Sequence, residues 1–532
     1  MNRSLRWLYA AALCLVLLVL PQLAAPAQAT EPADTTAATT VPETTLAPDA
    51  TTPPEATEVP ENREAVNISD RSTVTNFSGF RSIDFLFDKN DTKSSQYPQK
   101  CSMTLEHADG IGSLYLVFLT EYGSYTLTDN ATGTEYVVED ALLHDFVDVQ
   151  AAFGTAPTSV TVTFPKGNLA LTEVYIFTPG QVPAFVQQWK LPEDGKTDLV
   201  LFSTHGDDEQ LFFAGILPYY AKELGYQVQV VYLTDHHNFS GTTRQREMLD
   251  GLWAVGVDTY PVFGTFKDFR IDNKEATYNK FKQYGVSKDD LVGYVVENIR
   301  RFKPKVVVGH DFKGEYGHGQ HQVYAEVLSI AVGLSMDETQ FPESAATYGV
   351  WDVPKAYFHL YKENPIVMDW DQPMESFDGM TPYEVTIKLG FQKHKSQVPY
   401  FSWYYSGANK ASQIKQYSPC EFGLFRSTVG EDVEKNDFFE NVTTHARDAE
   451  LEAIRKAEEE AARIAAELEA KRKAEEEAAA REAARLAVEE AAAQEAAKEA
   501  RNRNIMMMVL WSVSIGLVIV AIPLARFGKK RS

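Results

Sequence analysis

Short apolar runs alternate with longer helix-type segments between about residues 196 and 332, and this alternation most strongly constrains the fold. A run that is apolar throughout is typical of a strand buried on both faces, and strands separated by helices pair in parallel. The strand-type runs are 198–202, 227–233 and 305–308, and the helix-type segments are 210–224, 243–255, 289–302 and 321–332. Residues 193–445 are therefore predicted to form an α/β domain with a mainly parallel sheet, whose ligands bind beyond the carboxyl ends of the strands.

Residues 67–192 have the pattern of an all-β domain instead. Apolar and polar residues alternate in 83–87, 113–118, 159–164 and 173–177, with turn-forming residues between these runs. Such alternation predicts a β-sandwich. The start of this region and its closing stretch from Ile176 to Trp189 resemble galactose-binding-like domains attached to some bacterial surface enzymes. That resemblance implies contact with carbohydrate, and a purely structural domain is the equal alternative.

Both ends of the chain predict export and retention at a membrane. Residues 1–29 combine Arg3 and Arg6, an apolar run and Ala27-Gln28-Ala29, as a cleaved signal peptide does. Residues 505–525 are uncharged over roughly the ~20 residues that a transmembrane helix needs, and residues 526–532 form a basic tail. These features predict a single-pass protein of the cell membrane, with its catalytic domain outside the cytoplasm and the tail inside.

Two segments of biased composition flank the predicted domains. Residues 30–66 are mostly Thr, Pro, Ala and Glu with almost nothing to bury, which predicts a disordered spacer. Residues 446–504 are nearly all Ala, Glu, Arg and Lys, with acidic and basic residues three or four positions apart. This spacing predicts a helical stalk. The stalk is either a solvated single helix or a loose coiled coil through which the chain self-associates.

The 532-residue chain has a formal net charge of −24, most of it between residues 67 and 446. A nucleic-acid binder must neutralise phosphates with Lys and Arg, so the charge argues against nucleic acid as a partner. It also favours neutral or amine-bearing glycans over anionic polymers. Of the three cysteines, Cys101 and Cys420 are far apart in the sequence and are predicted to be free thiols.

Two loops that follow predicted strands carry the residues suited to catalysis. The first loop contains His205, Asp207 and Asp208, and the second contains His318 and His321. Acidic residues at a helix start often only complement the helix dipole, and a lone His-x-x-His is often solvent-exposed. Dipole capping does not require histidines in both loops, however. Two histidines and a carboxylate are a ligand set for Zn²⁺ or another divalent metal, with a position left open for water.

Four motifs in order resemble the PIG-L/LmbE-like N-acetylglucosaminyl deacetylase family, over about residues 196–441. The motifs are His205-Gly-Asp-Asp-Glu209, Gly314-Glu-Tyr-Gly-His318-Gly-Gln-His321, Arg244-Gln-Arg-Glu247 followed by Gly256-Val257, and His394-Lys-Ser-Gln397. The expected catalytic domain is Rossmann-like. Gly206 stands where the family most often has Pro, and Gln320 stands where some members have an acid between the histidines.

The resemblance implies a role for each of seven residues. The metal would be bound by His205, Asp208 and His321. Asp207 would be the general base for the attacking water, and His318 would stabilise the oxyanion and help to protonate the leaving amine. Arg244 and Asp268 are candidates for holding sugar hydroxyls. The implied activity is removal of N-acetyl groups from N-acetylglucosamine-type sugars in extracytoplasmic glycans, or from a related amino-sugar substrate.

Two other functions compete with this interpretation. A surface glycan-binding or adhesion protein with an inactive deacetylase-like domain would account for the β-sandwich, spacer and stalk. The complete set of five loop residues argues against it, since a degenerate site usually loses one of them. An Fe(II) oxygenase also uses two histidines and one carboxylate. The α/β pattern around the loops and the additional Asp207 favour hydrolysis.

Overall fold

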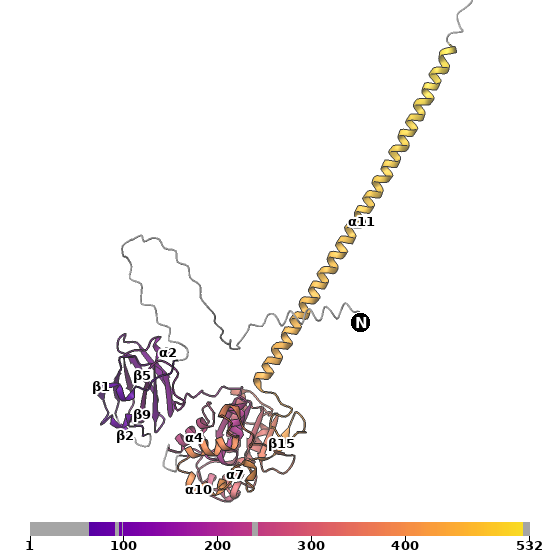
Figure 1. Ribbon diagram of the computed structural model, residues 1–532. Helices are drawn as coiled ribbons and strands as arrows, with labels where there is room; N and C mark the ends of the chain where they lie inside the picture. The colour runs from indigo at the N-terminus through magenta and orange to yellow at the C-terminus, as the bar shows by residue number, and fades with distance from the viewer. Residues whose placement is uncertain (1–62, 91–94, 98, 237–242, 525–532) are drawn as a thin grey trace, which may run out of the picture. The chain divides into compact units, whose positions relative to one another are not determined.

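The computed structural model describes residues 63–90, 95–97, 99–236 and 243–524. The predicted signal peptide, the tail and nearly all of the spacer lie outside these residues. The described chain forms two antiparallel sheets, then a mixed α/β body, then one long helix (Figure 1).

Two antiparallel sheets built from residues 73–177 enclose a shared cluster of buried side chains. The five-stranded sheet has the order β1 (Thr73–Ser78), β3 (Cys101–Glu106), β8 (Ser159–Phe164), β5 (Gly123–Asp129) and β6 (Glu135–Ala141). The four-stranded sheet has the order β2 (Ser95–Tyr97), β9 (Leu169–Phe177), β4 (Ser113–Phe118) and β7 (His144–Asp148). Alternate residues of β8 are buried, as its sequence pattern predicts. The strand predicted at 83–87 is wrong, because Asp84–Phe87 is a 3₁₀ helix that buries only Leu86.

The α/β body is built on a six-stranded sheet in the order β11-β10-β12-β13-β15-β14. The first four strands are parallel: β11 (Val228–Tyr232), β10 (Leu199–Ser203), β12 (Val306–Gly309) and β13 (Lys355–His359). The last two are antiparallel: β15 (Glu421–Ser427) and β14 (Pro365–Val367). Strand β11 pairs with one edge of β10, and β12, which comes later in the chain, pairs with the other edge. The carboxyl ends of β10 and β12 therefore meet at a switch point, where open α/β sheets bind their ligands.

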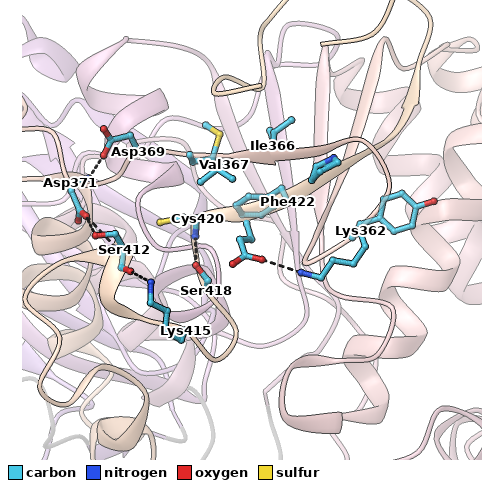
Figure 2. Close-up of a pocket in the computed structure, with 14 residues that line it drawn as sticks. Lys362, Ile366, Val367, Asp369, Asp371, Ser412, Lys415, Ser418, Cys420 and Phe422 are labelled. Carbon is cyan, nitrogen blue, oxygen red and sulfur yellow. Dashed lines mark hydrogen bonds and ion pairs between the residues drawn. The ribbon is translucent and has the colours of Figure 1, made fainter. Parts of the chain in front are cut away.

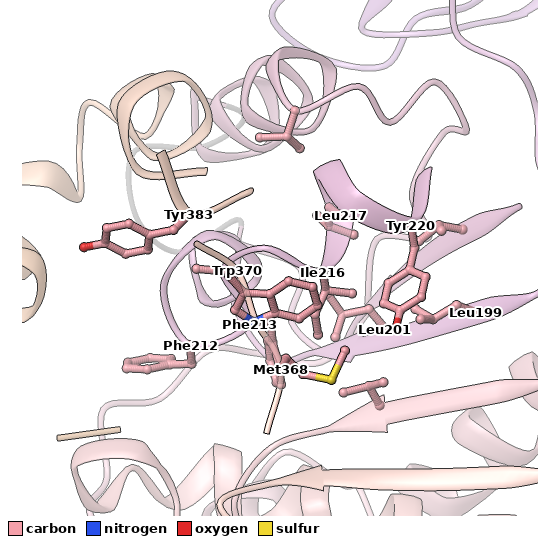
Figure 3. Packing of buried hydrophobic residues seen from close by; sticks show 14 of the residues in the cluster. Leu199, Leu201, Phe212, Phe213, Ile216, Leu217, Tyr220, Met368, Trp370 and Tyr383 are labelled. Atoms are coloured by element: carbon pink, nitrogen blue, oxygen red, sulfur yellow. The ribbon is translucent and has the colours of Figure 1, made fainter. Parts of the chain in front are cut away.

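Helices cover both faces of this sheet. Leu199 and Leu201 of β10 join one buried cluster, whereas Val200 and Phe202 join another, as expected for a strand buried on both faces. Figure 3 shows part of the first cluster around Trp370. The main helices are α4 (Thr243–Ala254), α5 (Lys274–Gln283), α6 (Lys288–Phe302), α7 (Gly319–Leu334), α8 (Pro342–Tyr348) and α10 (Val398–Tyr405).

The helix predicted over 210–224 is not continuous. Helix α3 (Asp208–Leu211) ends early, and a π-helical turn over Pro218–Glu223 follows. Between them, Gly215 has φ +96°, and a Cβ there would lie 2.5 Å from the Trp370 ring. Only glycine accepts both the backbone conformation and this close approach.

The last described element is helix α11 (His445–Leu524), so the predicted stalk is one continuous helix. The transmembrane helix predicted at 505–525 and the single-pass membrane location are wrong, because no helix among the described residues is sufficiently long and apolar to span a bilayer.

Cys101 and Cys420 are both buried and free, which confirms that they form no bridge with each other. Burial raises the pKa of both thiols, and that of Cys420 reaches about 12. Neither thiol is therefore a reactive nucleophile at neutral pH.

Candidate metal and catalytic site

The two predicted loops meet at the carboxyl edge of the sheet. The first loop leaves β10 and enters α3, and the second leaves β12, passes through a 3₁₀ turn over Glu315–Gly317 and enters α7. Because β10 and β12 are paired neighbours, their loops lie side by side. All five predicted loop residues are buried there: His205, Asp207, Asp208, His318 and His321.

Three of these side chains bring their donor atoms into a nearly equilateral triangle. His205 Nδ1 lies 3.1 Å from Asp208 Oδ2 and 3.1 Å from His321 Nε2. Asp208 Oδ2 lies 3.2 Å from His321 Nε2. Tetrahedral ligands bound at 2.0–2.1 Å stand about 3.3–3.4 Å apart. The spacing and the donor types therefore fit one divalent metal ion.

In each histidine of the triangle, the ring nitrogen that is not part of the triangle lies close to a carboxylate. His205 Nε2 lies 3.3 Å from Asp268 Oδ1, and His321 Nδ1 lies 2.7 Å from Glu315 Oε2. Metal-binding histidines are usually oriented by such carboxylates, which also fix the tautomer. Asp268 was predicted to hold sugar hydroxyls, and the structure places it against His205 as well as at the wall of the adjoining cavity.

Glu315 is the centre of a buried network that the sequence did not reveal. Its Oε2 is also 2.9 Å from His310 Nδ1, and its Oε1 is 2.6 Å from His359 Nδ1. All four side chains are fully buried. His359 Nε2 lies 2.9 Å from the Ser418 carbonyl oxygen. Both ring nitrogens of His359 thus face acceptors, which ties Glu315 to β13.

Two further histidines hold the first loop in place. The backbone N–H of Thr204 donates to His310 Nε2 at 3.0 Å, and the N–H of Gly206 donates to His236 Nε2 at 2.6 Å. His310 also lies near Asp208 and His321, in a group that could hold a metal. Both of its ring nitrogens are already engaged, however, so His310 positions the loop instead of serving as a ligand.

Asp207 faces the cavity beside the triangle. Burial raises the pKa of its carboxyl to about 6, against the opposing attraction of Arg244. Arg244 Nη2 lies 3.5 Å from Asp207 Oδ2 and donates to the Gly206 carbonyl at 3.0 Å. Arg244, which is predicted to hold sugar hydroxyls, lies at the cavity wall with its guanidinium beside Asp207 and the Gly206 carbonyl.

His318 caps the first turn of α7. Its Nδ1 accepts a hydrogen bond from the Gln320 backbone N–H at 3.2 Å, so the neutral ring carries its proton on Nε2. Burial lowers the pKa of His318 to about 2. Gln320, which stands where some family members have an acid, accepts from the Phe269 N–H and donates to the Lys267 carbonyl. It therefore holds the 267–269 segment, which carries Asp268, and does not contact His318 through its side chain.

A cavity of about 490 Å³ adjoins the triangle. His205, Asp207, Arg244, Asp268 and His318 form its polar wall, and its other side is largely aromatic. This size and mixed lining suit a small polar ligand.

A second cavity, of about 410 Å³, lies along β14 and β15 (Figure 2). Its charges are paired within the protein: Lys362 with Glu421 at 3.0 Å, and Asp371 with the Ala411 N–H at 2.7 Å. None of the residues proposed for catalysis lines this cavity.

Comparisons with known proteins agree with the loop motifs. Residues 200–332 match the family model described as PIG-L: GlcNAc-PI de-N-acetylase. A 1D-myo-inositol 2-acetamido-2-deoxy-alpha-D-glucopyranoside deacetylase of Mycobacterium leprae is 29% identical over 189 residues, which cover 31% of this chain and 59% of that protein. A deacetylase of the same name from Saccharopolyspora erythraea is 27% identical over 204 residues, which cover 35% of this chain and 72% of that protein.

Among solved structures, the N,N'-diacetylchitobiose deacetylase of Pyrococcus horikoshii overlaps 43% of this chain and 84% of its own. Its TM-score is 0.31 and its sequence identity is 15%. The chain spans 59% of the length of the Mycobacterium leprae relative. The family model matches residues 200–332, which lie in the α/β body. Residues 200–332 form a PIG-L/LmbE-like domain, as the loop motifs predict.

Proposed function

We propose that this chain is a divalent-metal-dependent hydrolase that removes the acetyl group from N-acetylglucosamine-type sugars. The observation that carries the proposal is the triangle of His205, Asp208 and His321 donor atoms, 3.1–3.2 Å apart, at the wall of a cavity. The names of the relatives, which are deacetylases of acetamido sugars, support the same reaction class.

In this proposal His205, Asp208 and His321 bind the metal, with Zn²⁺ the ion that best suits two imidazoles and a carboxylate. When bound, the metal would polarise the amide carbonyl and make an attacking water more acidic. Asp268 and Glu315 would keep the two imidazoles in the required tautomer and orientation.

The remaining steps belong to Asp207 and His318. Asp207 accepts the proton of the water that attacks the acetamido carbon, and Arg244 holds its carboxylate at the cavity wall. His318 directs Nε2–H into the cavity, where it donates to the oxyanion as the carbonyl becomes tetrahedral. The proton taken from water then passes to the departing sugar amine, and acetate is released.

The test is acetate release by the full-length protein. N-acetylglucosamine, N,N'-diacetylchitobiose and an N-acetylglucosaminyl inositol are each incubated with the purified chain, and acetate and free amine are quantified together. We expect equal amounts of both products, loss of activity after chelation and recovery on addition of Zn²⁺. Activity that survives complete removal of divalent metal would refute the proposal, and sugar binding without acetate release would favour the adhesion alternative.

A further inference from the structure

Helix α10 exposes aromatic rings beside the candidate active site. Five of its eight residues, VPYFSWYY, are aromatic. Tyr400 is 71% exposed and Trp403 is 49% exposed, whereas Tyr404 is buried. Exposed large aromatic groups on a soluble surface often mark a binding site. The labelled α10 can be followed in Figure 1.

Trp403 lines two cavities. One is the 490 Å³ cavity that also contains His205, Asp207 and His318. The other, of about 360 Å³, is bounded by Trp403 and the loop that follows α10, with Asn409, Gln413 and Gln416 in its wall. Trp403 is therefore a wall that the two cavities share.

The second cavity has the chemistry of a sugar site. Amide side chains donate and accept hydrogen bonds, as sugar hydroxyls require, and an indole offers a flat apolar face with an N–H at its edge. Ser406 and Lys415 add further polar groups to the wall of this cavity, which disfavours an alkyl chain as its occupant.

We infer that Trp403 and the loop over residues 406–416 form a second subsite, which binds the sugar unit next to the N-acetylated one. The inference rests on the proposed function and narrows its substrate class to oligosaccharides. The acetylated unit occupies the cavity at Asp207 and His318, and the neighbouring unit stacks on Trp403.

The helix that carries this subsite is fixed to the catalytic loop. Tyr404 donates from its hydroxyl to the Tyr417 carbonyl at 2.7 Å, which joins α10 to the loop after it. The Phe401 ring lies 6.0 Å from the Tyr316 ring, and Tyr316 lies 5.5 Å from His318. Trp403 is thus held at a set position relative to the candidate catalytic residues.

The experiment compares substrates of different length in the full chain. We measure kcat/KM for acetate release from N-acetylglucosamine, its β-linked tetrasaccharide and its octyl glycoside. The expected wild-type ratio of tetrasaccharide to monosaccharide is at least about 10, and Trp403→Ala lowers that ratio about tenfold, which corresponds to about 1.4 kcal/mol. Trp511→Ala, which removes an exposed Trp of α11, serves as the matched control and keeps the ratio.

Binding is measured separately with Asp207→Asn, so that turnover is not needed. Tetrasaccharide binding to this variant, measured by calorimetry, weakens about tenfold when Trp403→Ala is added. A wild-type ratio near 1, or a high ratio that persists in Trp403→Ala, would overturn the subsite. The subsite would also be overturned if the octyl glycoside showed the same increase in kcat/KM over N-acetylglucosamine and Trp403→Ala abolished that increase. Absence of acetate from every substrate, with Trp403-dependent tetrasaccharide binding retained, would refute the proposed function and leave the subsite standing.

Discussion

Glu315 shows at the residue scale how this site is organised. One buried carboxylate accepts hydrogen bonds from His310, His321 and His359, and thereby joins the two loops to the neighbouring strand β13. An amide cannot replace it in all three contacts, because its NH₂ group donates where the carboxylate accepts. Glu315 should therefore matter to metal binding although it is not itself a ligand.

We expect Glu315→Gln to weaken metal retention about 10- to 100-fold, the usual effect of removing a carboxylate that orients a ligand histidine. The measurement is metal content after dialysis against graded chelator. Glu326→Gln is the matched control, because Glu326 is paired with Lys274 and Lys288 away from the site. Equal metal retention by the two variants would show that Glu315 does not support His321.

A second prediction at this scale concerns Glu173 of β9, which is fully buried. Burial raises its pKa to about 7, and Asp88 adds to the shift. The carboxyl therefore contributes stability below its unfolded pKa of about 4.5, and this contribution is lost as pH rises through about 7. At pH 8, Glu173→Gln should raise the free energy of unfolding by about 1–2 kcal/mol relative to wild type. At pH 5 the increase should be smaller. Calorimetric scans at both pH values test this, and a constant difference would contradict it.

The sequence identified the ligand candidates because the two loops that carry their motifs each follow a strand-type run. It could not identify Glu315 as their support, because one of its partners, His359, lies 44 residues further along the chain. The assignment of Arg244 and Asp268 to sugar hydroxyls was likewise made without their protein contacts. Only the folded chain places Arg244 on Asp207 and Asp268 on His205.

At the scale of elements, the loop between β10 and α3 depends on its backbone. The Gly206 N–H donates a hydrogen bond to His236, and the Gly206 carbonyl accepts one from Arg244. Hydrogen bonds therefore fix both backbone polar groups of this residue. A Cβ at Gly206 would lie 2.1 Å from Met248 Cγ. These contacts account for glycine at this position. The continuous helix predicted over 210–224 is interrupted near Gly215, which has φ +96° and also lies against Trp370, a residue far away in the sequence.

Gly206→Pro is predicted to lower kcat/KM by about tenfold more than Gly206→Ala. Both variants add a Cβ that meets Met248, but only proline removes the N–H that His236 accepts. Steady-state kinetics on N,N'-diacetylchitobiose measure the difference. If alanine and proline are equally harmful, the hydrogen bond to His236 does not position the loop.

At the scale of the whole molecule, α11 is attached to the α/β body only near its first turns among the described contacts. The His445 N–H donates to Asp198 at 2.7 Å, and Asp448 pairs with Lys305. From Ala453 to Glu499 every residue of the helix is exposed. Its Ala, Glu, Arg and Lys composition was sufficient to predict a helix, since i,i+4 pairs such as Arg455–Glu459 stabilise it locally.

Truncation after Glu452 should therefore leave the melting temperature and kcat/KM unchanged. Truncation after Thr444 removes His445 and Asp448, and leaves Lys305 without its carboxylate. We expect it to lower the unfolding free energy by about 1–2 kcal/mol, which is several degrees in Tm for a domain of this size. Calorimetry of the two truncated chains checks this, and equal melting temperatures would contradict the proposed attachment.

The central claim is that His205, Asp208 and His321 bind a metal while Asp207 performs the proton transfer. The most direct measurement combines bound metal with acetate release in Asp207→Asn and His321→Gln. We predict that Asp207→Asn retains one metal ion per chain but loses about 10²–10⁴-fold in kcat, whereas His321→Gln loses the metal itself. Full acetate release by metal-loaded Asp207→Asn, or undiminished metal binding by His321→Gln, would contradict the account.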